Sequence, residues 1–521
     1  MVEAKNVRIL WVDDEIELLK SHIFYLKEKG FDVDTATNGQ DALDMVEEIQ
    51  FDIVFLDENM PGLSGLEVLN QLKNILPTVP VVMITKSEEE DIMDQAIGSR
   101  IADYLIKPVN PTQILLTIKK HVDQRRLVAE KTTHSYQSEF GKIGLKINES
   151  YNFNDWSDVY KQLVNWEIEL EETKGEMDEV LKMQKTEANH AFTKFVKKNY
   201  HDWIKGTDDD APLMSHQLMK SKVLPMLENG EKVVMLVIDN FRYDQWVTIR
   251  QNISESYRVD SEEIYSSILP TATQYARNSL FSGLMPAQIK QLYPQYWLNE
   301  NEEGSKNQFE DELVKTFFDR FRKSYSHYYH KVTNTDSGKE LLDNYNKMIT
   351  NDLSVVVFNF VDMLSHARTE SKMIKELASD ESAYRSLSKS WFSHSVMKLL
   401  LDKLEDENVK VIITTDHGTI RVKNPVKVVG DKNISLNLRY KQGKNLNYKA
   451  KEVFEITKPE EVMLPKSNVS TSYVFTCNDD FFAYPNNYNH YVSYYKDTFQ
   501  HGGVSMEEML IPYAVISPKN N

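Results

Sequence analysis

The chain has 521 residues, of which 41% are hydrophobic and 27% are charged, and this length suits roughly two to four globular domains. Its formal net charge of −18 weighs against binding to duplex DNA, because a protein surface that binds DNA gathers lysine and arginine on one face. No apolar run reaches the ~18 residues of a membrane span, and the single cysteine, Cys477, excludes an internal disulfide. We therefore expect a cytoplasmic protein that does not bind membranes.

Residues 1–121 alternate short apolar runs with amphipathic segments, and we expect them to form one domain. Helical patterns such as 15–29 and 39–48 separate the apolar runs. Strands are expected at 7–12, 32–35, 53–56, 81–84 and 103–106. Five such β/α units predict a parallel sheet that is covered by helices on both faces.

Polar side chains stand where the strands of this predicted sheet end. Asp13 and Asp14 end the first strand, Asp57 the third, Thr85 the fourth and Lys107 the fifth. The carboxyl ends of parallel strands meet at one edge, where three carboxylates would repel one another unless Mg²⁺ held them. The metal and Lys107 would neutralise a phosphoryl group moving to Asp57, and Thr85 would hydrogen-bond the product oxygen. Each residue alone also fits a helix cap or a loop, but the ordered set predicts a phospho-acceptor site.

The segments LDENMPGLSG and YLIKP resemble the receiver domains of two-component response regulators. The resemblance implies a flavodoxin-like (CheY-like) five-stranded fold and phosphorylation of Asp57 by a cognate sensor histidine kinase. It also implies that Asn59 gives a backbone carbonyl to the metal, and that Tyr104 reorients together with Thr85 on activation. Because phosphorylated receiver domains often self-associate, we expect a phosphorylation-dependent homodimer.

The strand pattern disappears between residues 122 and 215. Segments 155–170 and 189–204 carry apolar residues at helical spacing, with Trp156, Trp166 and Trp203 as bulky anchors. We expect a helical-bundle linker domain that joins the two ends of the protein.

From residue 216 to 521 the β/α alternation returns on a larger scale. Residues 232–238, 354–360 and 410–414 are nearly continuous apolar runs, as buried parallel strands require. These runs predict a larger α/β domain, whereas residues 430–500 are polar, aromatic and irregular and give no assignment.

Metal-ligand and hydroxyl side chains stand in five segments of this domain, and most of them directly follow an apolar strand. They are Asp239, Thr271, Thr273, Asp362, His366, Asp416, His417 and His501. Asp362 and His366 are four residues apart, so on a helix both point the same way. Mixed carboxylate and imidazole ligands suit zinc or manganese. Six ligands suffice for two ions, which at roughly 4 Å apart can bind the attacking and leaving oxygens of a phosphoryl displacement. A threonine hydroxyl beside them would be the nucleophile.

The segments VIDNFRYDQ and LPTATQYARNSLFSG resemble the PglZ branch of the alkaline phosphatase superfamily. A receiver domain joined to such a domain resembles, over the full length, the PorX-type regulators of type IX protein secretion. The resemblance implies one Zn²⁺ held by Asp362, His366 and His501. It implies a second Zn²⁺ held by Asp239, Asp416, His417 and the nucleophilic threonine.

The identity of that threonine stays open at the level of the sequence. In the superfamily the nucleophile commonly lies ten residues before a glycine, here Gly283, which selects Thr273. Thr271, however, directly follows the proline that ends the strand segment. Arg277, one helical turn after Thr273, is expected to contact a phosphate.

Two functions follow from these patterns. The leading hypothesis is a zinc-dependent phosphodiesterase, controlled by receiver phosphorylation, whose substrate the resemblance suggests is an oligonucleotide or another nucleotide phosphodiester. The alternative is a signalling adaptor whose metal-stabilised C-terminal domain binds a partner such as a sigma factor. The complete ligand set favours the enzyme, because structural zinc sites are usually closed and rich in cysteine.

Overall fold

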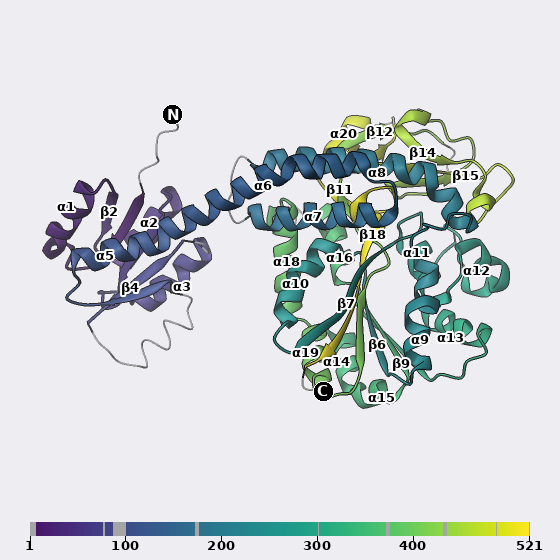
Figure 1. The fold of residues 1–521 in the computed structure, drawn as a ribbon, viewed down its shortest axis with the longest axis horizontal. Coiled ribbons are helices and arrows are strands. Elements are labelled where there is room, and N and C mark those ends of the chain that lie inside the picture. Colours follow the sequence, from purple (N-terminus) through teal and green to yellow (C-terminus); the bar gives the residue numbers. More distant parts are fainter. Residues whose placement is uncertain are drawn as a thin grey trace. The chain divides into compact units, whose positions relative to one another are not determined.

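The structure is a computed structural model that divides into two compact units, residues 1–135 and 136–521 (Figure 1). It describes residues 7–76, 79–86, 101–171, 177–300, 302–370, 376–430, 435–485 and 487–519, without the side chains of 123–131 and 367–370. The boundaries predicted at residues 121 and 215 stay predictions.

The first unit contains a five-stranded, fully parallel sheet in the order β2-β1-β3-β4-β5. Its strands are β1 (Arg8–Val12), β2 (Asp32–Ala36), β3 (Ile53–Asp57), β4 (Val81–Thr85) and β5 (Asp103–Ile106). The described helices around it are α1 (Lys20–Glu28), α2 (Gly39–Glu48), α3 (Gly65–Ile75) and α5 (Pro111–Ile118). The CheY-like fold predicted from the sequence is therefore confirmed.

Successive residues of β1 point to opposite faces of this sheet and enter two different apolar cores. Leu10 and Val12 pack with α2 and α3, whereas Ile9 and Trp11 pack with α1 and α5. Burial on both faces explains why the strands read as continuous apolar runs rather than as alternating ones.

The second unit is built on a six-stranded sheet in the order β7-β18-β10-β6-β9-β8. Its strands are β6 (Val233–Ile238), β7 (Tyr257–Ser266), β8 (His327–Val332), β9 (Leu353–Phe358), β10 (Lys410–Thr414) and β18 (Leu510–Pro518). Neighbouring strands among β8, β9, β6 and β10 are parallel, whereas β18 is antiparallel to both of its neighbours. The larger α/β domain expected from the sequence is confirmed.

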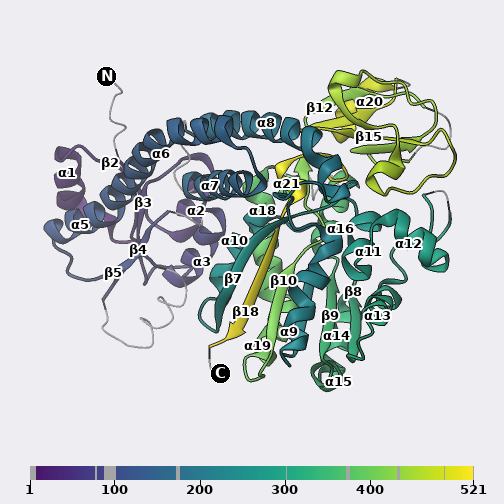
Figure 2. The same cartoon turned by 45° about the vertical axis from the view of Figure 1, so that its right-hand side comes forward.

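Helices cover both faces of the larger sheet (Figures 1 and 2). Helices α10 (Tyr243–Ile253) and α18 (Glu381–His394) lie on one face, and α11 (Thr273–Ser282) and α13 (Glu310–Arg320) on the other. The remaining helices of this part are α9 (Leu224–Glu228), α12 (Pro286–Leu292), α14 (Thr335–Asp343), α15 (Tyr345–Thr350), α16 (Phe360–Glu370) and α19 (Val396–Leu404).

Residues 420–500, which include the segment 430–500 left unassigned from the sequence, contain three small sheets. Strand β11 (Ile420–Arg421) pairs with β17 (Phe499–Gln500), and β12 (Asn424–Lys427) pairs with β16 (Asp480–Ala483). The third sheet has the order β13 (Tyr440–Gly443), β15 (Ser472–Thr476) and β14 (Val453–Ile456). Two short helices follow β16 in the sequence: α20 (Tyr488–Tyr495) precedes β17, and α21 (Met506–Met509) precedes β18.

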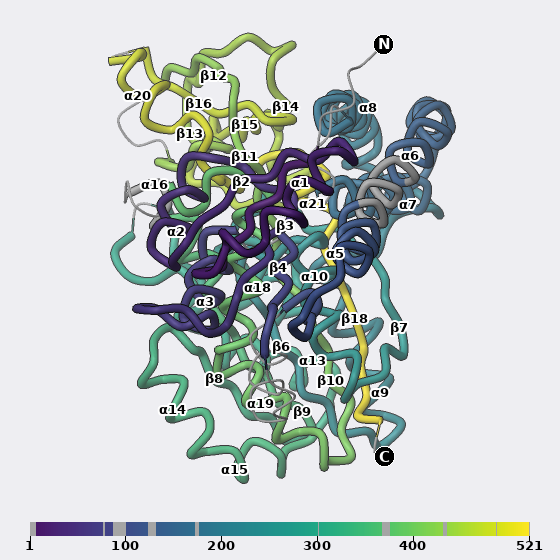
Figure 3. Tube along the Cα trace, turned by 90° about the vertical axis from the view of Figure 1, so that its left-hand side faces the viewer, coloured from purple at the N-terminus to yellow at the C-terminus, as the bar shows by residue number. Residues whose placement is uncertain are grey.

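Three long helices stand between the two sheets in the sequence: α6 (Gln124–Glu149), α7 (Phe153–Glu171) and α8 (Met177–Lys205). Helices α7 and α8 lie side by side (Figure 3). Their buried residues Trp156, Phe192 and Trp203 share one apolar core with β6, β9 and β10. The linker helices are thus part of the second unit's core. None of the helices in the described ranges is long and apolar enough to cross a bilayer.

Candidate functional site

In the first unit, the predicted acidic cluster forms at the carboxyl edge of the sheet. The Lys107 Nζ atom lies 2.8 Å from Asp13 Oδ2 and 2.8 Å from Asp57 Oδ2. Asp13, Asp14 and Asp57 each offer a carboxylate oxygen within 4.8 Å of the others. Because hard oxygen ligands and excess negative charge are what Mg²⁺ prefers, the donor set fits that ion.

The other predicted receiver residues surround this cluster. Thr85 is buried at the end of β4, Asn59 is exposed two residues after Asp57, and Tyr104 on β5 is 40% exposed. Burial raises the pKa of Asp57 although Lys107 opposes it. Burial would lower the pKa of Lys107, but hydrogen bonds to Asp13 and Asp57 outweigh burial and raise it. The ammonium is therefore held in its charged form between two carboxylates.

In the second unit, the predicted ligands gather at the carboxyl edge of the larger sheet. Asp239, Asp416 and His417 follow β6 and β10, and His501 follows β17. Asp362 and His366 lie in the first two turns of α16, which follows β9, so all six reach the edge where ligands bind in α/β sheets. Their donor atoms form two groups, each within 4.8 Å. The first triad is Asp239, Asp416 and His417, and the second triad is Asp362, His366 and His501. These are the two groups that the resemblance implied.

The first triad follows β6 and β10 directly. The His417 Nε2 atom lies 3.6 Å from Asp416 Oδ2 and 3.9 Å from Asp239 Oδ1. On the other side of the ring, His417 Nδ1 lies 3.1 Å from the Gly418 carbonyl oxygen. A carbonyl only accepts, so Nδ1 carries the hydrogen and Nε2 presents its lone pair to the two carboxylates.

The second triad joins α16 to the segment that follows β17. The Asp362 Oδ1 atom lies 3.5 Å from His366 Nε2 and 3.7 Å from His501 Nε2. His501 Nδ1 donates to the Thr271 carbonyl oxygen at 3.1 Å, which again leaves Nε2 as the free lone pair. Burial and then the neighbouring Asp239 raise the pKa of Asp362 to about 6. Burial and then His417 lower the pKa of His501 far below its usual value, so this imidazole is neutral.

The residues of both triads fit divalent zinc. Asp416 is fully buried, yet its Oδ2 atom accepts no hydrogen bond within the part of the chain that the structure describes. Burial and then Asp239 raise the pKa of Asp416, although His417 and Arg277 oppose them. Three carboxylates and three imidazoles, of which His417 and His501 present free Nε2 lone pairs, form the mixed oxygen and nitrogen donor set that suits zinc.

The two threonines have hydroxyls in different surroundings. Thr273 opens α11, and its Oγ1 atom lies 3.3 Å from Asp239 Oδ1 and 3.1 Å from His417 Nε2. Thr271 is fully buried, and its hydroxyl donates to the Gly503 carbonyl oxygen at 2.9 Å. The same hydroxyl accepts from the Gly502 amide at 3.0 Å. Thr273 therefore faces the first triad, whereas the Thr271 hydroxyl is occupied by backbone.

Arg277 lies beneath the first triad. Its side chain is 1% exposed, and its Nη1 atom is 2.6 Å from Asp239 Oδ2 and 3.7 Å from Asp416 Oδ2. Its Nε atom donates to Glu310 Oε1 at 2.5 Å. Burial would raise the pKa of Asp239, but Arg277 and then His417 together outweigh burial and lower it. In this structure the guanidinium orders carboxylates, and the expected phosphate contact stays a prediction.

Two residues of the site were missed from the sequence. The Asn240 Nδ2 atom donates to Ser365 Oγ at 3.0 Å and lies 3.4 Å from Asp362 Oδ1, so it ties the loop after β6 to α16. Its backbone φ of 63° is left-handed, which asparagine tolerates, and its place beside Asp239 could have drawn attention to it. Glu310, which fixes Arg277, lies 33 residues away and no sequence pattern marks it.

Three family descriptions match this chain in succession. The response regulator receiver domain matches residues 9–119, and the PorX response regulator linker domain matches 126–204. The BREX system PglZ alkaline phosphatase-like domain matches residues 218–516, more than half of the chain.

Several curated relatives are similar to about a quarter of this chain. The transcriptional regulatory protein ZraR of Klebsiella oxytoca is 33% identical over 143 residues, 27% of this chain and 32% of ZraR. The transcriptional regulatory protein ResD of Bacillus subtilis (strain 168) is 33% identical over 119 residues, 23% of this chain and 49% of ResD. The chain thus spans about a third to a half of the length of these curated relatives.

Among solved structures, a CheY-like receiver domain protein from Methanospirillum hungatei JF-1 is 28% identical, with a TM-score of 0.23. The match covers 23% of this chain and 96% of that one. Receiver, linker and PglZ domain follow one another along the sequence in the order that the three descriptions give. The chain belongs to the PorX-type response regulators, in which a receiver domain is joined to an alkaline phosphatase-like PglZ domain.

Proposed function

We propose that this protein is a cytoplasmic response regulator, phosphorylated on Asp57, whose PglZ domain is a zinc-dependent phosphodiesterase for nucleotide or oligonucleotide substrates. One observation carries the proposal. The Thr273 hydroxyl lies 3.3 Å from Asp239 and 3.1 Å from His417, beside two triads of zinc-type ligands. A hydroxyl in that position has the surroundings of an activated nucleophile.

The residues of the site suggest how the ester would be cleaved. Thr273 Oγ1 forms a bond to phosphorus while the bond from phosphorus to the leaving ester oxygen breaks. The hydroxyl proton goes to water, the leaving oxygen takes a proton from water, and a second water later cleaves the bond from threonine to phosphorus. Backbone amides in the first turn of α11, which begins at Thr273, would hold the phosphate. Zinc ions in the two triads would supply positive charge to the reacting oxygens.

The proposal also covers regulation and biological role. Lys107 bridges Asp13 and Asp57, so a phosphoryl group received from a cognate sensor histidine kinase would alter this contact directly. Such a change would reach the PglZ domain through phosphorylation-dependent homodimerisation. A role in type IX secretion follows from membership of the PorX type.

The testing experiment compares hydrolysis of bis-(p-nitrophenyl) phosphate with that of p-nitrophenyl phosphate, with added Zn²⁺ or a chelator. Asp239→Ala removes a first-triad ligand, and Asp209→Ala, in an exposed loop, is the matched control. The proposal is supported if the protein cleaves the diester, if the chelator stops cleavage, and if Asp239→Ala abolishes it while Asp209→Ala does not. Absence of cleavage despite stoichiometric bound zinc would contradict it and favour the adaptor that binds a partner such as a sigma factor.

A further inference from the structure

A linker side chain contacts the segment that carries His501. Asn189, on α8, is 5% exposed, and its Oδ1 atom accepts from the Met506 amide at 2.8 Å. Its Nδ2 atom donates to Glu507 Oε2 at 2.9 Å. The Met506 amide is the first of α21 and has no partner within that helix, as at every helix start. A residue 317 positions away in the sequence therefore satisfies it.

The same segment is held at its other end by residues of the site. Glu508 is fully buried and accepts from the Gly503 amide at 2.8 Å. The Gly502 amide donates to the Thr271 hydroxyl, and His501 Nδ1 donates to the Thr271 carbonyl. Residues 501–508 are thus held at one end by Thr271, which also bonds the His501 ring, and at the other end by Asn189 of α8.

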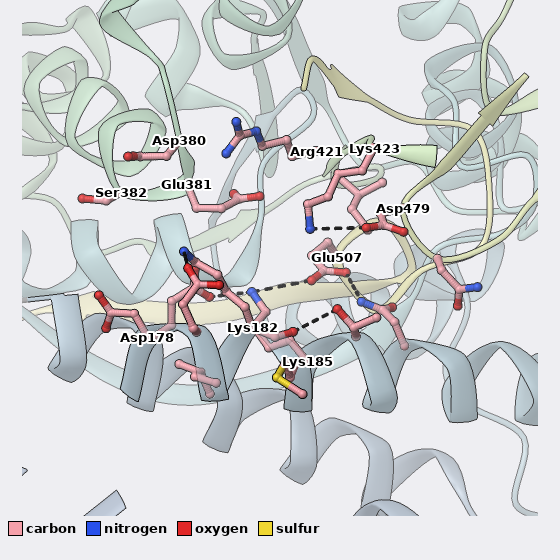
Figure 4. A pocket seen from close by; sticks show the side chains of 18 of the residues that line it. Asp178, Lys182, Lys185, Asp380, Glu381, Ser382, Arg421, Lys423, Asp479 and Glu507 are labelled. Atoms are coloured by element: carbon pink, nitrogen blue, oxygen red, sulfur yellow. Dashed lines mark hydrogen bonds and ion pairs between the residues drawn. The ribbon is translucent and has the colours of Figure 1, made fainter. Parts of the chain in front are cut away.

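A pocket of about 500 Å³ lies beside the contact, between the linker helices and the PglZ domain (Figure 4). Asn189 and Glu507 both line it. Lys185 and Glu507 point toward one another there, with Lys185 Nζ 3.6 Å from Glu507 Oε1 (Figure 4). The pocket adjoins the Glu507 side chain, which therefore has room to move if the amide of Asn189 is removed.

We propose that Asn189 is a positioning residue, through which helix α8 holds segment 501–508 so that His501 Nε2 faces Asp362. This inference rests on the proposed metal-dependent function. Asn189 hydrogen-bonds to α21 rather than to a ligand side chain, so it acts through the segment. Replacing a residue that hydrogen-bonds directly to a metal ligand commonly changes metal affinity about 10- to 100-fold, and because Asn189 acts one step further from the ligand, the lower end of that range is expected. Asn189→Ala is therefore expected to weaken zinc binding at the second triad about 10-fold while binding at the first triad is unchanged.

The test is a zinc titration of the full-length protein against a competing chelator, which resolves the affinities of the two sites. Asn199→Ala is the matched control, because Asn199 lies on the same helix and its amide donates to the nearby Phe195 carbonyl. At limiting zinc, Asn189→Ala should lower kcat with KM nearly unchanged, and excess zinc should restore kcat.

A compensating pair of substitutions separates positioning from general stability. Asn189→Asp alone places a carboxylate against Glu507 and should weaken the second triad at least as much as Asn189→Ala. In the double variant with Glu507→Gln, the carboxylate at position 189 still accepts from the Met506 amide, and it now also accepts from the amide side chain at position 507. The zinc affinity of the second triad should therefore return to within about threefold of wild type.

Each remaining outcome has a definite meaning. A wild-type protein that binds no zinc would overturn the proposed function itself. A wild-type protein with two zinc sites, together with unchanged second-triad affinity in Asn189→Ala, would overturn only the positioning role. Equal weakening of both sites in Asn189→Ala would also overturn it. If Asn189→Ala does not fold, the double variant Asn189→Asp/Glu507→Gln takes its place in the test. A zinc affinity of its second triad as low as that of Asn189→Asp alone would exclude the positioning role of Asn189.

Discussion

At the scale of single residues, the two threonines offer the sharpest prediction. Thr273→Val removes the hydroxyl that faces Asp239 and His417, and diester hydrolysis should fall by more than about 1,000-fold with bound zinc largely retained. Thr271→Val removes a hydroxyl that donates one hydrogen bond to the backbone and accepts another from it. The free energy of unfolding should therefore fall by about 1–3 kcal/mol. Parallel measurements of turnover, zinc content and thermal unfolding distinguish the two effects. If the Thr273→Val protein hydrolysed the diester at the wild-type rate, Thr273 would not be the nucleophile.

Lys441 supports a prediction about pH. It is fully buried on β13, its Nζ donates to the Ser435 carbonyl at 2.8 Å, and burial lowers its pKa from 10.5 to about 7. Between pH 7 and 10.5 the unfolded chain binds a proton that the folded protein does not, so stability rises with pH in this window. Below pH 7 the folded protein bears the full cost of a buried charge.

Lys441→Met removes that cost. The variant should be more stable than wild type by on the order of 3 kcal/mol at pH 6.5, and its advantage should shrink as the pH rises toward 9. Calorimetric unfolding of both proteins over this range is the measurement, with exposed Lys444 replaced in Lys444→Met as the control. An advantage that is constant with pH would show that Lys441 is charged throughout.

The metal-type residues could be predicted from the sequence because most of them directly follow an apolar strand or lie in the first turn of a helix that follows one. Strand ends in an α/β sheet converge, so Asp239 and Asp416 could be placed together without a structure. The surroundings of Thr271 could not, since Gly502 and Gly503, which occupy its hydroxyl, lie some 230 positions away. Asn189 was missed for the same reason, as its partners are more than 300 residues distant.

At the scale of secondary-structure elements, the loop after β10 packs against α21 with no room for a side chain. A Cβ atom at Gly418 would lie 2.0 Å from the Glu507 carbonyl oxygen. Gly418→Ala must therefore move either His417 or α21, and we expect a loss of about 2–4 kcal/mol together with weaker zinc binding at the first triad.

Gly141→Ala is the control for this prediction. Gly141 lies in α6, and a methyl group added there would meet no other part of the protein within 4 Å. Alanine at this position should be neutral or stabilising by up to about 1 kcal/mol. Thermal unfolding and zinc content of the two variants are to be compared. If Gly418→Ala unfolded at the wild-type temperature, the close approach to α21 would be disproved.

Three strands of the larger sheet were not predicted, for identifiable reasons. Strand β18 contains Pro512, which lacks an amide hydrogen and argues against a central strand, yet β18 lies between β7 and β10. Strand β7 is an edge strand whose sequence YRVDSEEIYS is charged and half exposed, so it has no apolar run. Strand β8 has two histidines and four partly exposed positions in succession. Local patterns revealed the buried parallel strands and missed those whose environment depends on distant neighbours.

At the scale of the whole molecule, the linker helices and the PglZ domain form one cooperative body. Trp156, Phe192 and Trp203 pack into the core that contains β6 and β10. A chain of residues 136–521 should therefore fold, bind zinc and unfold in a single calorimetric transition. A chain of residues 216–521 exposes the apolar surface that these helices cover, and it should aggregate. A soluble, zinc-binding 216–521 fragment with native stability would contradict this view.

The position of β18 has a consequence for how the protein is made. Residues 510–518 are synthesised after the other five strands of the sheet, yet they form a strand in its interior, between β7 and β10. His501 and α21 immediately precede this strand. The receiver domain can fold while the ribosome is still translating the rest, but the metal-type residues cannot assemble until residue 518 has left the exit tunnel. A nascent chain that stalls before β18 is made would carry a folded receiver domain but no assembled metal site in the PglZ domain.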